Sequence, residues 1–410
     1  MRILILGLNF HPELTGIGKY TGELAIYLGA KGHQVHVITS PPYYPHWQIQ
    51  PGYSRWWYHQ EYLQSVKVFR CPLWVPRKPS GIKRLLHLLT FALTSFPILL
   101  GQCFWKPNLI LCIAPTILNA PFALFAARLC RANVWLHVQD FELDAASFLG
   151  LLPANNLITR VAGRVERSLL KHFDKISTIS NRMLARLLQK EVPAENILLF
   201  PNWVDTKLIF PLPESQATLR KEFFIPCDKT IVLYSGNMGH KQGLEIVIET
   251  AKLLNKQSNI HFVLCGEGAL RSDLEKDSQG LDNVQFLALQ PIEKLNQLLN
   301  IADIHLLPQR ADAADLVMPS KLSGMLASGK AVIATANPGT EVAEIVGMLG
   351  VVISPNDAKA MADAILELAN NPERMCILGE KGRSWVIANW SKKKVLDNYC
   401  DFLSKGIAIN

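Results

Sequence analysis

The chain has 410 residues, of which 49% are hydrophobic and 19% charged, and its formal net charge is +8. This composition argues against a disordered chain and is typical of a globular α/β protein, and the length predicts two domains. The 8 Cys are scattered without a C-x-x-C pair, which argues against a zinc knuckle or a disulfide framework and suits a reducing cytoplasm.

The charge is divided unevenly between the two halves of the chain. Residues 1–205 carry a net charge of +10, and residues 206–410 a net charge of −2. A basic half could bind nucleic acid or an anionic membrane surface. Because no nucleic-acid-reading motif accompanies the charge, we expect a membrane-facing first half and no nucleic-acid partner.

The first 40 residues predict a βαβ unit. An apolar run ending at Gly7 is too short for a signal peptide and is typical of a strand buried on both faces. A helix over 20–31 and a strand over 34–39 complete the unit. Between them, Gly16 and Gly18 either let a ligand approach the backbone or make an ordinary tight turn, and they do not form the G-x-G-x-x-G fingerprint.

An aromatic, proline-broken loop over 41–58 and a strand over 66–70 follow. Next comes an apolar segment, 85–105, which has the length of a membrane span and is preceded by Lys83 and Arg84. A His, a Pro and a Gln within the segment argue against a full span. The alternative, a mostly buried helix with one edge in the membrane interface, is favoured by the basic flank and the Trp-rich loop.

Further strands in the first half are predicted at the ranges 109–114, 134–139, 175–179 and 197–200, with helices at 157–172 and 181–190. His137 and Asp140 fall at the carboxyl end of the second of these strands, the edge where ligands bind in an open α/β sheet. A lone His at a strand end is often structural, so both interpretations stay open for His137.

The second half repeats the alternation of strands and helices. Its strands are predicted at 230–235, 260–265, 284–287, 304–307, 331–334 and 351–354, with a helix over 244–256 after the first strand. We therefore predict two Rossmann-like doubly wound α/β domains facing each other across a cleft. Their expected bounds are 1–205 for the first domain, 206–228 for a linker, 229–385 for the second domain, and 386–410 for a helix packing back on the first.

One stretch, 315–335, predicts an anion site. A helix is expected to start at Pro319-Ser320 and to stop at Gly329. A helix N-terminus favours anions, so Lys321 in the first turn is out of place unless it meets an anionic ligand. An ordinary surface helix is the alternative.

Several motifs follow one another along nearly the whole chain: "GIGKYTGELAIYLGAKGHQVHVIT", "HVQD", "STIS", "PNWVD", "YSGNMGHKQGLE" and "CGEG". Their order resembles that of the retaining GT-B glycosyltransferases of family 4. The stretches "SPPYYPHWQ", "RLLHLLTFALTSF" and "AADLVMPSKL" resemble members that make colanic acid. The resemblance implies transfer of a sugar, fucose from GDP-fucose, to a lipid-linked oligosaccharide by a cytoplasmic enzyme peripherally bound to the inner membrane.

The resemblance also implies roles for residues of the first half. Gly16 and Gly18 match the loop that approaches the donor phosphates and the acceptor. His137 matches the active-site His near the reacting sugar, where it would bind the sugar and not act as a strong base.

For the second half, the resemblance implies a nucleotide site. Lys241 lies next to the position of the family's phosphate-binding Lys, and Asn237 stands where many members have Arg. Glu267 matches a loop near the nucleotide. Ser320 and Lys321 belong to a Pro-Ser-Lys variant of the donor-site helix.

The sequence departs from the family at its E-x7-E pattern. The two carboxylates would stand at 316 and 324, where this chain has Leu316 and Gly324. We expect Asp312 or Asp315 to take over the sugar contact, and Asp140 to lie near the acceptor or the sugar.

The chain offers no D-x-D motif, so we predict metal-independent transfer without a cofactor. Fixed donors and cations would stabilise the leaving diphosphate. Two other interpretations stay open: a nucleotide-sugar 2-epimerase of the same fold, and a non-catalytic partner in a polysaccharide assembly complex.

Overall fold

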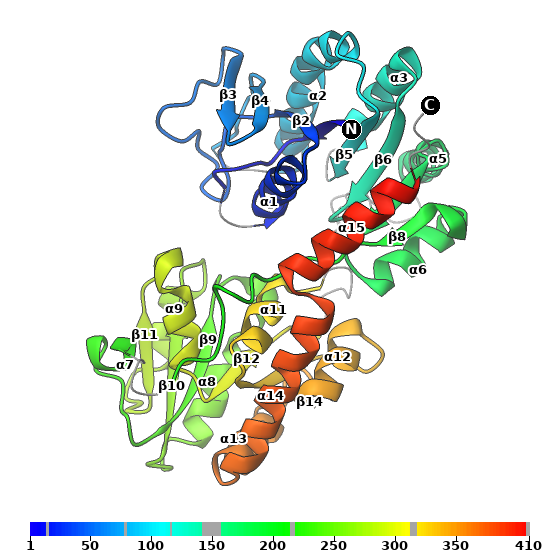
Figure 1. The fold of residues 1–410 in the computed structure, drawn as a ribbon. Helices are drawn as coiled ribbons and strands as arrows, with labels where there is room; N and C mark the ends of the chain where they lie inside the picture. Colours follow the sequence, from blue (N-terminus) through cyan, green and yellow to red (C-terminus); the bar gives the residue numbers. More distant parts are fainter. Residues whose placement is uncertain are drawn as a thin grey trace. The chain divides into compact units, whose positions relative to one another are not determined.

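The computed structural model describes residues 1–13, 16–77, 80–114, 117–141, 157–213, 218–311 and 318–406. The chain divides into two compact units, each with a sheet of its own (Figure 1). Unit 1 comprises Met1–Asn202 and Leu396–Asn410, and unit 2 comprises Trp203–Val395.

Unit 1 is built on an 8-stranded sheet with the order β3-β4-β2-β1-β5-β6-β7-β8. The strands are β1 (Arg2–Gly7), β2 (Gln34–Thr39), β3 (His59–Leu63), β4 (Val66–Arg70), β5 (Leu109–Ala114), β6 (Asn133–Val138), β7 (Lys175–Thr178) and β8 (Ile197–Leu199). All pairs are parallel except β3 with β4, an edge hairpin whose first strand the sequence analysis missed. Chain order reverses between β1 and β5, which makes their carboxyl ends the place where a ligand is expected.

The helices of unit 1 are α1 (Gly16–Ala30), α2 (Gly81–Cys103), α3 (Ala120–Cys130), α5 (Leu157–Leu170) and α6 (Asn181–Gln189), with short 3-10 turns η1 (Ile117–Asn119) and η2 (Ala194–Asn196). The helix predicted over 20–31 starts four residues earlier, so Gly16 and Gly18 lie in its first turn and not in a preceding loop. The reason is local: Gly18 has no Cβ to collide with the loop that leads into the helix.

The last helix, α15 (Lys392–Gly406), contributes its residues from Leu396 onward to unit 1. The Tyr399 ring stacks on Phe200 with centroids 4.0 Å apart, and Asp397 accepts a 2.6 Å hydrogen bond from the hydroxyl of Tyr27. Helix α15 is therefore packed on both α1 and the β8 side of this sheet.

Unit 2 contains a 6-stranded, wholly parallel sheet with the order β11-β10-β9-β12-β13-β14. Its strands are β9 (Thr230–Ser235), β10 (Ile260–Cys265), β11 (Val284–Leu287), β12 (Ile304–Leu307), β13 (Ala331–Thr335) and β14 (Val351–Ile353). Its helices are α7 (Thr218–Glu222), α8 (Glu245–Leu253), α9 (Arg271–Asp277), α10 (Leu295–Asn300), α11 (Ser320–Ala327), α12 (Glu341–Leu349), α13 (Ala358–Ala369) and α14 (Pro372–Asn389), with 3-10 turns η4 (His240–Gln242) and η5 (Ile292–Lys294). The predicted strands agree with these to within one residue at either end.

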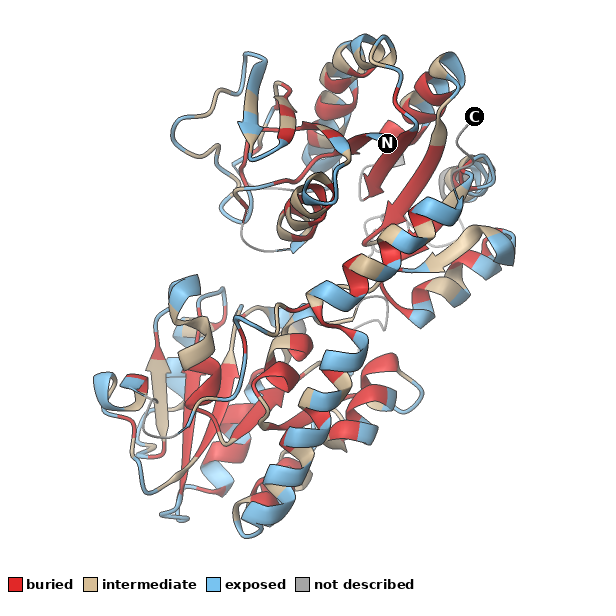
Figure 2. Cartoon of the chain, in the orientation of Figure 1, coloured by how far each residue is buried: buried red, intermediate tan, exposed pale blue. Residues whose placement is uncertain are grey.

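The interpretation of 85–105 as a mostly buried helix is wrong. Only 28% of the most apolar stretch of α2 is buried, and among the described helices α2 alone is long and apolar enough to cross a membrane. One stripe of the helix, which includes Phe91, Ala92 and Leu99, packs into the unit. Buried and exposed positions both run along α2 in Figure 2, because the sheet below can cover only one face of a helix whose apolar residues lie all round.

Candidate functional site

At the carboxyl edge of the unit 2 sheet, the loops after β9 and β10 pack backbone against backbone. The amide of Gly236 donates to the carbonyl of Cys265 over 2.8 Å, and the amide of Met238 donates to that of Glu267 over 2.8 Å. At Gly266, which has φ +150°, an added Cβ would lie 1.9 Å from the carbonyl oxygen of Gly236. Glycine is therefore required for the two loops to meet, and their amides form a fixed edge.

Lys321 reaches this edge from the first turn of α11. Its Nζ donates a 2.8 Å hydrogen bond to the Tyr234 hydroxyl, and a Cβ added at Gly236 would come within 2.4 Å of the same Nζ. Burial lowers the pKa of Lys321 to about 8, which means that the ammonium has lost much of its hydration. In the part of the chain that the structure describes, no carboxylate forms an ion pair with it. A partly desolvated cation at a helix N-terminus is suited to receive an anion.

Two other predicted residues lie on the neighbouring loops. Asn237 is exposed, and its carbonyl accepts a 2.5 Å hydrogen bond from the Tyr234 hydroxyl. The Glu267 carboxylate is paired at 2.9 Å with Arg271, whose guanidinium also donates to the carbonyl of Gly266. Glu267 therefore helps to hold the loop after β10.

The remaining predicted residues of unit 2 are only partly described. Ser320 is the first residue of α11 and is exposed. The backbone of Lys241 lies in the turn η4, but its side chain is outside the described atoms. Asp312, Asp315 and Leu316 lie outside the described residues.

A pocket of about 530 Å³ opens beside the first turn of α8. Its lining includes Glu245, Glu249 and Arg310. Two carboxylates and one guanidinium are better suited to bind the hydroxyl groups of a sugar than a diphosphate. The phosphates are therefore expected to bind near Lys321 and not in this pocket.

In unit 1, the corresponding edge is organised by Glu13. One carboxylate oxygen accepts from the amides of Tyr43 and Tyr44 at 3.0 Å each, and the other accepts from the Asn9 side chain at 2.9 Å. Burial raises the pKa of Glu13. A Cβ added at Gly18 would lie 2.6 Å from the Glu13 carboxylate, so this glycine lets α1 begin directly on the buried acid.

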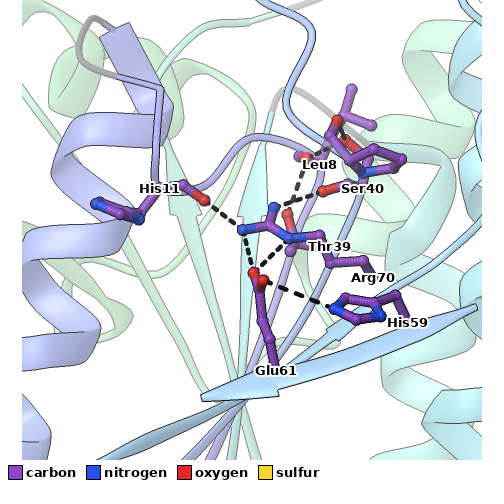
Figure 3. A network of polar contacts seen from close by, with 8 residues as sticks. Leu8, His11, Thr39, Ser40, His59, Glu61 and Arg70 are labelled. Atoms are coloured by element: carbon purple, nitrogen blue, oxygen red, sulfur yellow. Dashed lines mark hydrogen bonds and ion pairs between the residues drawn. The ribbon is translucent and has the colours of Figure 1, made fainter. Parts of the chain in front are cut away.

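Arg70 at the end of β4 fixes the loop that leads to α1 (Figure 3). Its guanidinium donates to the carbonyls of His11 and Ser40 at 2.6 and 2.8 Å, and pairs with Glu61 at 2.6 Å. These carbonyls follow β1 and β2, so one buried cation ties two strand ends together.

His137 is the fifth residue of β6 and is 3% exposed. Its Nδ1 lies 2.9 Å from the Ser177 hydroxyl, and its Nε2 lies 2.9 Å from the Gln139 amide nitrogen. Burial lowers the pKa of His137 to about 3, so the ring is neutral. Gln139 also donates to Asn202, and these two side chains form a polar layer over the imidazole at the carboxyl edge. Asp140 follows β6 and is partly buried.

The structure thus brings Lys321 together with the loops of Asn237 and Glu267, and it places Gly18 and His137 on the sheet edge of unit 1. Sequence analysis missed Glu13 and Tyr234 as parts of these edges. Glu13 is the only carboxylate among the first 22 residues, a signal that could have been used, whereas Tyr234 is hidden in an apolar strand. In the described part of the chain, no group of three or more His, Cys, Asp or Glu side chains could hold a metal.

Comparison with known protein families gives two adjoining matches. Residues 15–203 match the glycosyl transferase 4-like domain, and residues 215–385 match glycosyl transferases group 1.

Individual proteins agree with this result. The chain is 42% identical over 388 residues to the colanic acid biosynthesis glycosyl transferase WcaI of Escherichia coli K12, covering 93% of this chain and 95% of that protein. It is 26% identical to the GDP-mannose-dependent alpha-(1-6)-phosphatidylinositol monomannoside mannosyltransferase of Mycobacterium tuberculosis, covering 98% of each.

Among solved structures, sucrose-phosphate synthase from Thermosynechococcus elongatus superposes with a TM-score of 0.75 at 19% identity, covering 99% of this chain and 98% of that one. This likeness shows the GT-B fold of two Rossmann-like units. The two family matches and the relative that is 42% identical show that the chain belongs to the group 1, family 4-like glycosyltransferases.

Proposed function

We propose that the protein is a retaining glycosyltransferase that moves fucose from GDP-fucose to a lipid-linked oligosaccharide during colanic acid or related exopolysaccharide synthesis. The observation that carries the proposal is the ammonium of Lys321, held at the N-terminus of α11 beside the glycine-lined loops of β9 and β10. The name of the relative WcaI supports the pathway. The name of the mannosyltransferase supports a GDP-sugar donor and a lipid acceptor.

In this reaction the bond between the sugar C1 and the diphosphate oxygen breaks, and the acceptor oxygen bonds to C1 on the same face. The acceptor proton passes to the leaving diphosphate. Negative charge therefore grows where Lys321 and the N-terminal amides of α11 lie, so their interaction is stronger in the transition state than in the ground state. The neutral, buried His137 would orient the sugar through the polar layer above it and would not remove a proton.

We also propose that transfer needs no metal ion, and that the enzyme works at the cytoplasmic face of the inner membrane. Lys241 is assigned to the phosphates on the resemblance alone, and Asp312 or Asp315 is assigned to the sugar in place of the carboxylates that the family has at 316 and 324. A lipid-linked acceptor requires the enzyme to reach a bilayer surface, and the basic first half of the chain suits an anionic one.

The test uses the purified protein, a panel of radiolabelled nucleotide sugars and a lipid-linked acceptor, with and without EDTA. Label in the lipid fraction from GDP-fucose alone, unaffected by EDTA, is the expected result. A new nucleotide sugar formed without acceptor would show epimerisation, and binding without turnover would show a non-catalytic partner. Lys321→Ala should abolish transfer in a folded protein, and a near-normal rate would refute the phosphate site.

A further inference from the structure

We propose that the outer sides of α2 and α3 form a docking face that lies flat in the headgroup layer of an anionic lipid bilayer. The docking face consists of the exposed apolar residues Ile82, Leu85, Leu86, Leu89, Leu93, Phe104, Phe125 and Leu129 and the basic residues beside them. This inference rests on the membrane association proposed above and deepens it by naming the surface and its orientation.

The α2 part of the docking face is a helical stripe. Between Ile82 and Leu93 the exposed apolar residues recur at helical spacing, and Leu93 is 57% exposed. Phe104, which follows the last residue of α2, is 91% exposed. The opposite stripe, with His87, Phe91 and Leu99, is buried in unit 1. Because that stripe is packed on the sheet, α2 can lie on a bilayer but cannot cross it without leaving the fold.

The stripe continues onto α3, which lies beside α2 (Figure 1). The ring of Phe96 lies 4.6 Å from that of Phe122 and 6.3 Å from that of Phe125, which joins the two helices at their outer edge. Phe125 is 53% and Leu129 is 60% exposed. These ring contacts link the exposed apolar residues of the two helices, and a cluster of exposed apolar side chains of this kind marks an interaction site.

Aromatic side chains border the surface. Trp56 and Trp57 are 70% and 76% exposed, and the neighbouring Tyr58 hydroxyl donates a 3.0 Å hydrogen bond to the carbonyl of Thr94 in α2. The loop is thereby attached to the helix. Exposed Trp next to an apolar face is typical of the membrane interface.

Charge decides between a bilayer and a second copy of this chain. Residues 62–139 contain 9 Lys and Arg and not one Asp or Glu. Of these, Lys83, Arg84, Arg128 and Arg131 are exposed in or next to α2 and α3. A second copy would bring like charges together, whereas anionic headgroups complement them.

The test is flotation of the full-length protein with vesicles, with no nucleotide sugar present. We expect binding to vesicles of phosphatidylcholine with phosphatidylglycerol, little binding to phosphatidylcholine alone, and weakening by salt. Leu89→Ser/Leu93→Ser and Lys83→Glu/Arg84→Glu should each weaken binding about tenfold or more. The matched controls in unit 2, Leu253→Ser/Leu289→Ser and Lys393→Glu/Lys394→Glu, should bind like the parent protein.

Three results would overturn the proposal. One is binding that the docking-face variants leave unchanged. Another is a dimer in light scattering that Leu89→Ser/Leu93→Ser dissociates, since a second copy would then occupy the face. The third is retention in membranes after alkaline carbonate extraction, which would show a spanning helix. Because no sugar enters these assays, failure of vesicle binding and failure of the proposed transfer are separate outcomes.

Discussion

The two sheets carry charged side chains of opposite sign at their carboxyl edges: a buried carboxylate, Glu13, in unit 1 and a half-buried ammonium, Lys321, in unit 2. Glu13 accepts three hydrogen bonds from its own unit, two from backbone amides and one from Asn9. Lys321 has one hydrogen-bond partner among the described residues, the Tyr234 hydroxyl. Among the described residues, the Glu13 carboxylate is therefore satisfied within its own unit, whereas the Lys321 ammonium keeps N–H donors that suit an anion.

Both edges depend on glycine for the same reason and with different consequences. A Cβ at Gly18 would meet the Glu13 carboxylate at 2.6 Å and the Glu13 Cβ at 2.8 Å, with the carbonyl oxygen of Phe10 at 3.1 Å. A Cβ at Gly266 would meet only backbone atoms of Gly236, the nearest being the carbonyl oxygen at 1.9 Å. The Glu13 carboxylate can move aside at a lower cost than a backbone carbonyl, which carries its loop along. Substitution of Gly266 should therefore lower the free energy of unfolding more than substitution of Gly18.

The largest expected effect is on the folding of unit 2. In Gly266→Ala, the new Cβ would lie 1.9 Å from a carbonyl oxygen at φ +150°. We expect unfolding free energy to drop by about 4 kcal/mol or more, measured by urea denaturation. Gly280→Ala is the control, because Gly280 also has a positive φ (+83°) but nothing within 4 Å. Equal losses in the two variants would show that the close approach is unimportant.

The second prediction separates function from stability at Lys321. We expect Lys321→Met to lower transfer about 10²–10³-fold, because a cation that stabilises the leaving diphosphate is lost. At pH 7 the same variant should be more stable by about 1–3 kcal/mol, because a desolvated charge is removed. Lys359→Met, at an exposed position of α13, should change neither quantity.

The change of unfolding free energy with pH tests whether the Lys321 ammonium is desolvated in the folded protein. The pKa of Lys321 is about 8 in the folded protein and 10.5 as the ordinary value, so the unfolded chain binds more protons between these values. The parent protein should therefore gain stability relative to Lys321→Met as pH rises from 8 to 10.5. A constant difference across this window would refute a buried ammonium.

Most of the fold and part of the candidate site were predictable from the sequence. The order of strands and helices follows from apolar runs broken by glycine, and Lys321 is conspicuous as a cation at a helix start. Burial of α2 was not predictable, because apolar residues all round a helix do not show which face the sheet covers. The start of α1 was not predictable either, since it depends on where the Glu13 side chain lies.

The hydrogen-bond partners of the site side chains could not be predicted from the sequence either. Tyr234 sits in a buried apolar strand, and only the fold shows that its hydroxyl meets Lys321, 87 residues later. Likewise, the sequence left His137 open between a structural and a functional residue. Burial keeps its ring neutral, its hydrogen bonds hold the ring in place, and its role in transfer stays a prediction.

A smaller effect is expected from the glycine of unit 1. Gly18→Ala would press a Cβ against the Glu13 carboxylate, which must shift and lose part of its hydrogen bonding. We expect a loss of about 1–3 kcal/mol in unfolding free energy. The control Gly163→Ala, in α5 with nothing within 4 Å, should gain about 0.5–1 kcal/mol from helix propensity. If Gly18→Ala also proved stabilising, α1 would not begin on the buried acid.

An effect of similar size, confined to acid pH, is expected from two buried histidines that share a low pKa. Burial lowers the pKa of both His137 in unit 1 and His305 in unit 2 to about 3. The unfolded chain thus binds more protons below the ordinary pKa of 6.5, and each histidine should cost about 2 kcal/mol of stability between pH 7 and pH 5. In urea denaturation, His137→Gln and His305→Gln should each reduce the loss of unfolding free energy between pH 7 and pH 5 by this amount. His46→Gln, at an exposed position, should leave that loss unchanged.

Transfer rates separate the two histidines. His137 lies at the carboxyl end of β6. His305 is the second residue of β12, away from the carboxyl end, and its ring is hydrogen-bonded to the Ser328 hydroxyl. Only His137→Gln should therefore reduce transfer, and since the ring is neutral throughout, the rate of the parent protein should show no step near pH 6.5 from this residue. A step near that pH that His137→Gln abolishes would mean that the imidazole is protonated during turnover, and that the polar layer of Gln139 and Asn202 opens to admit water.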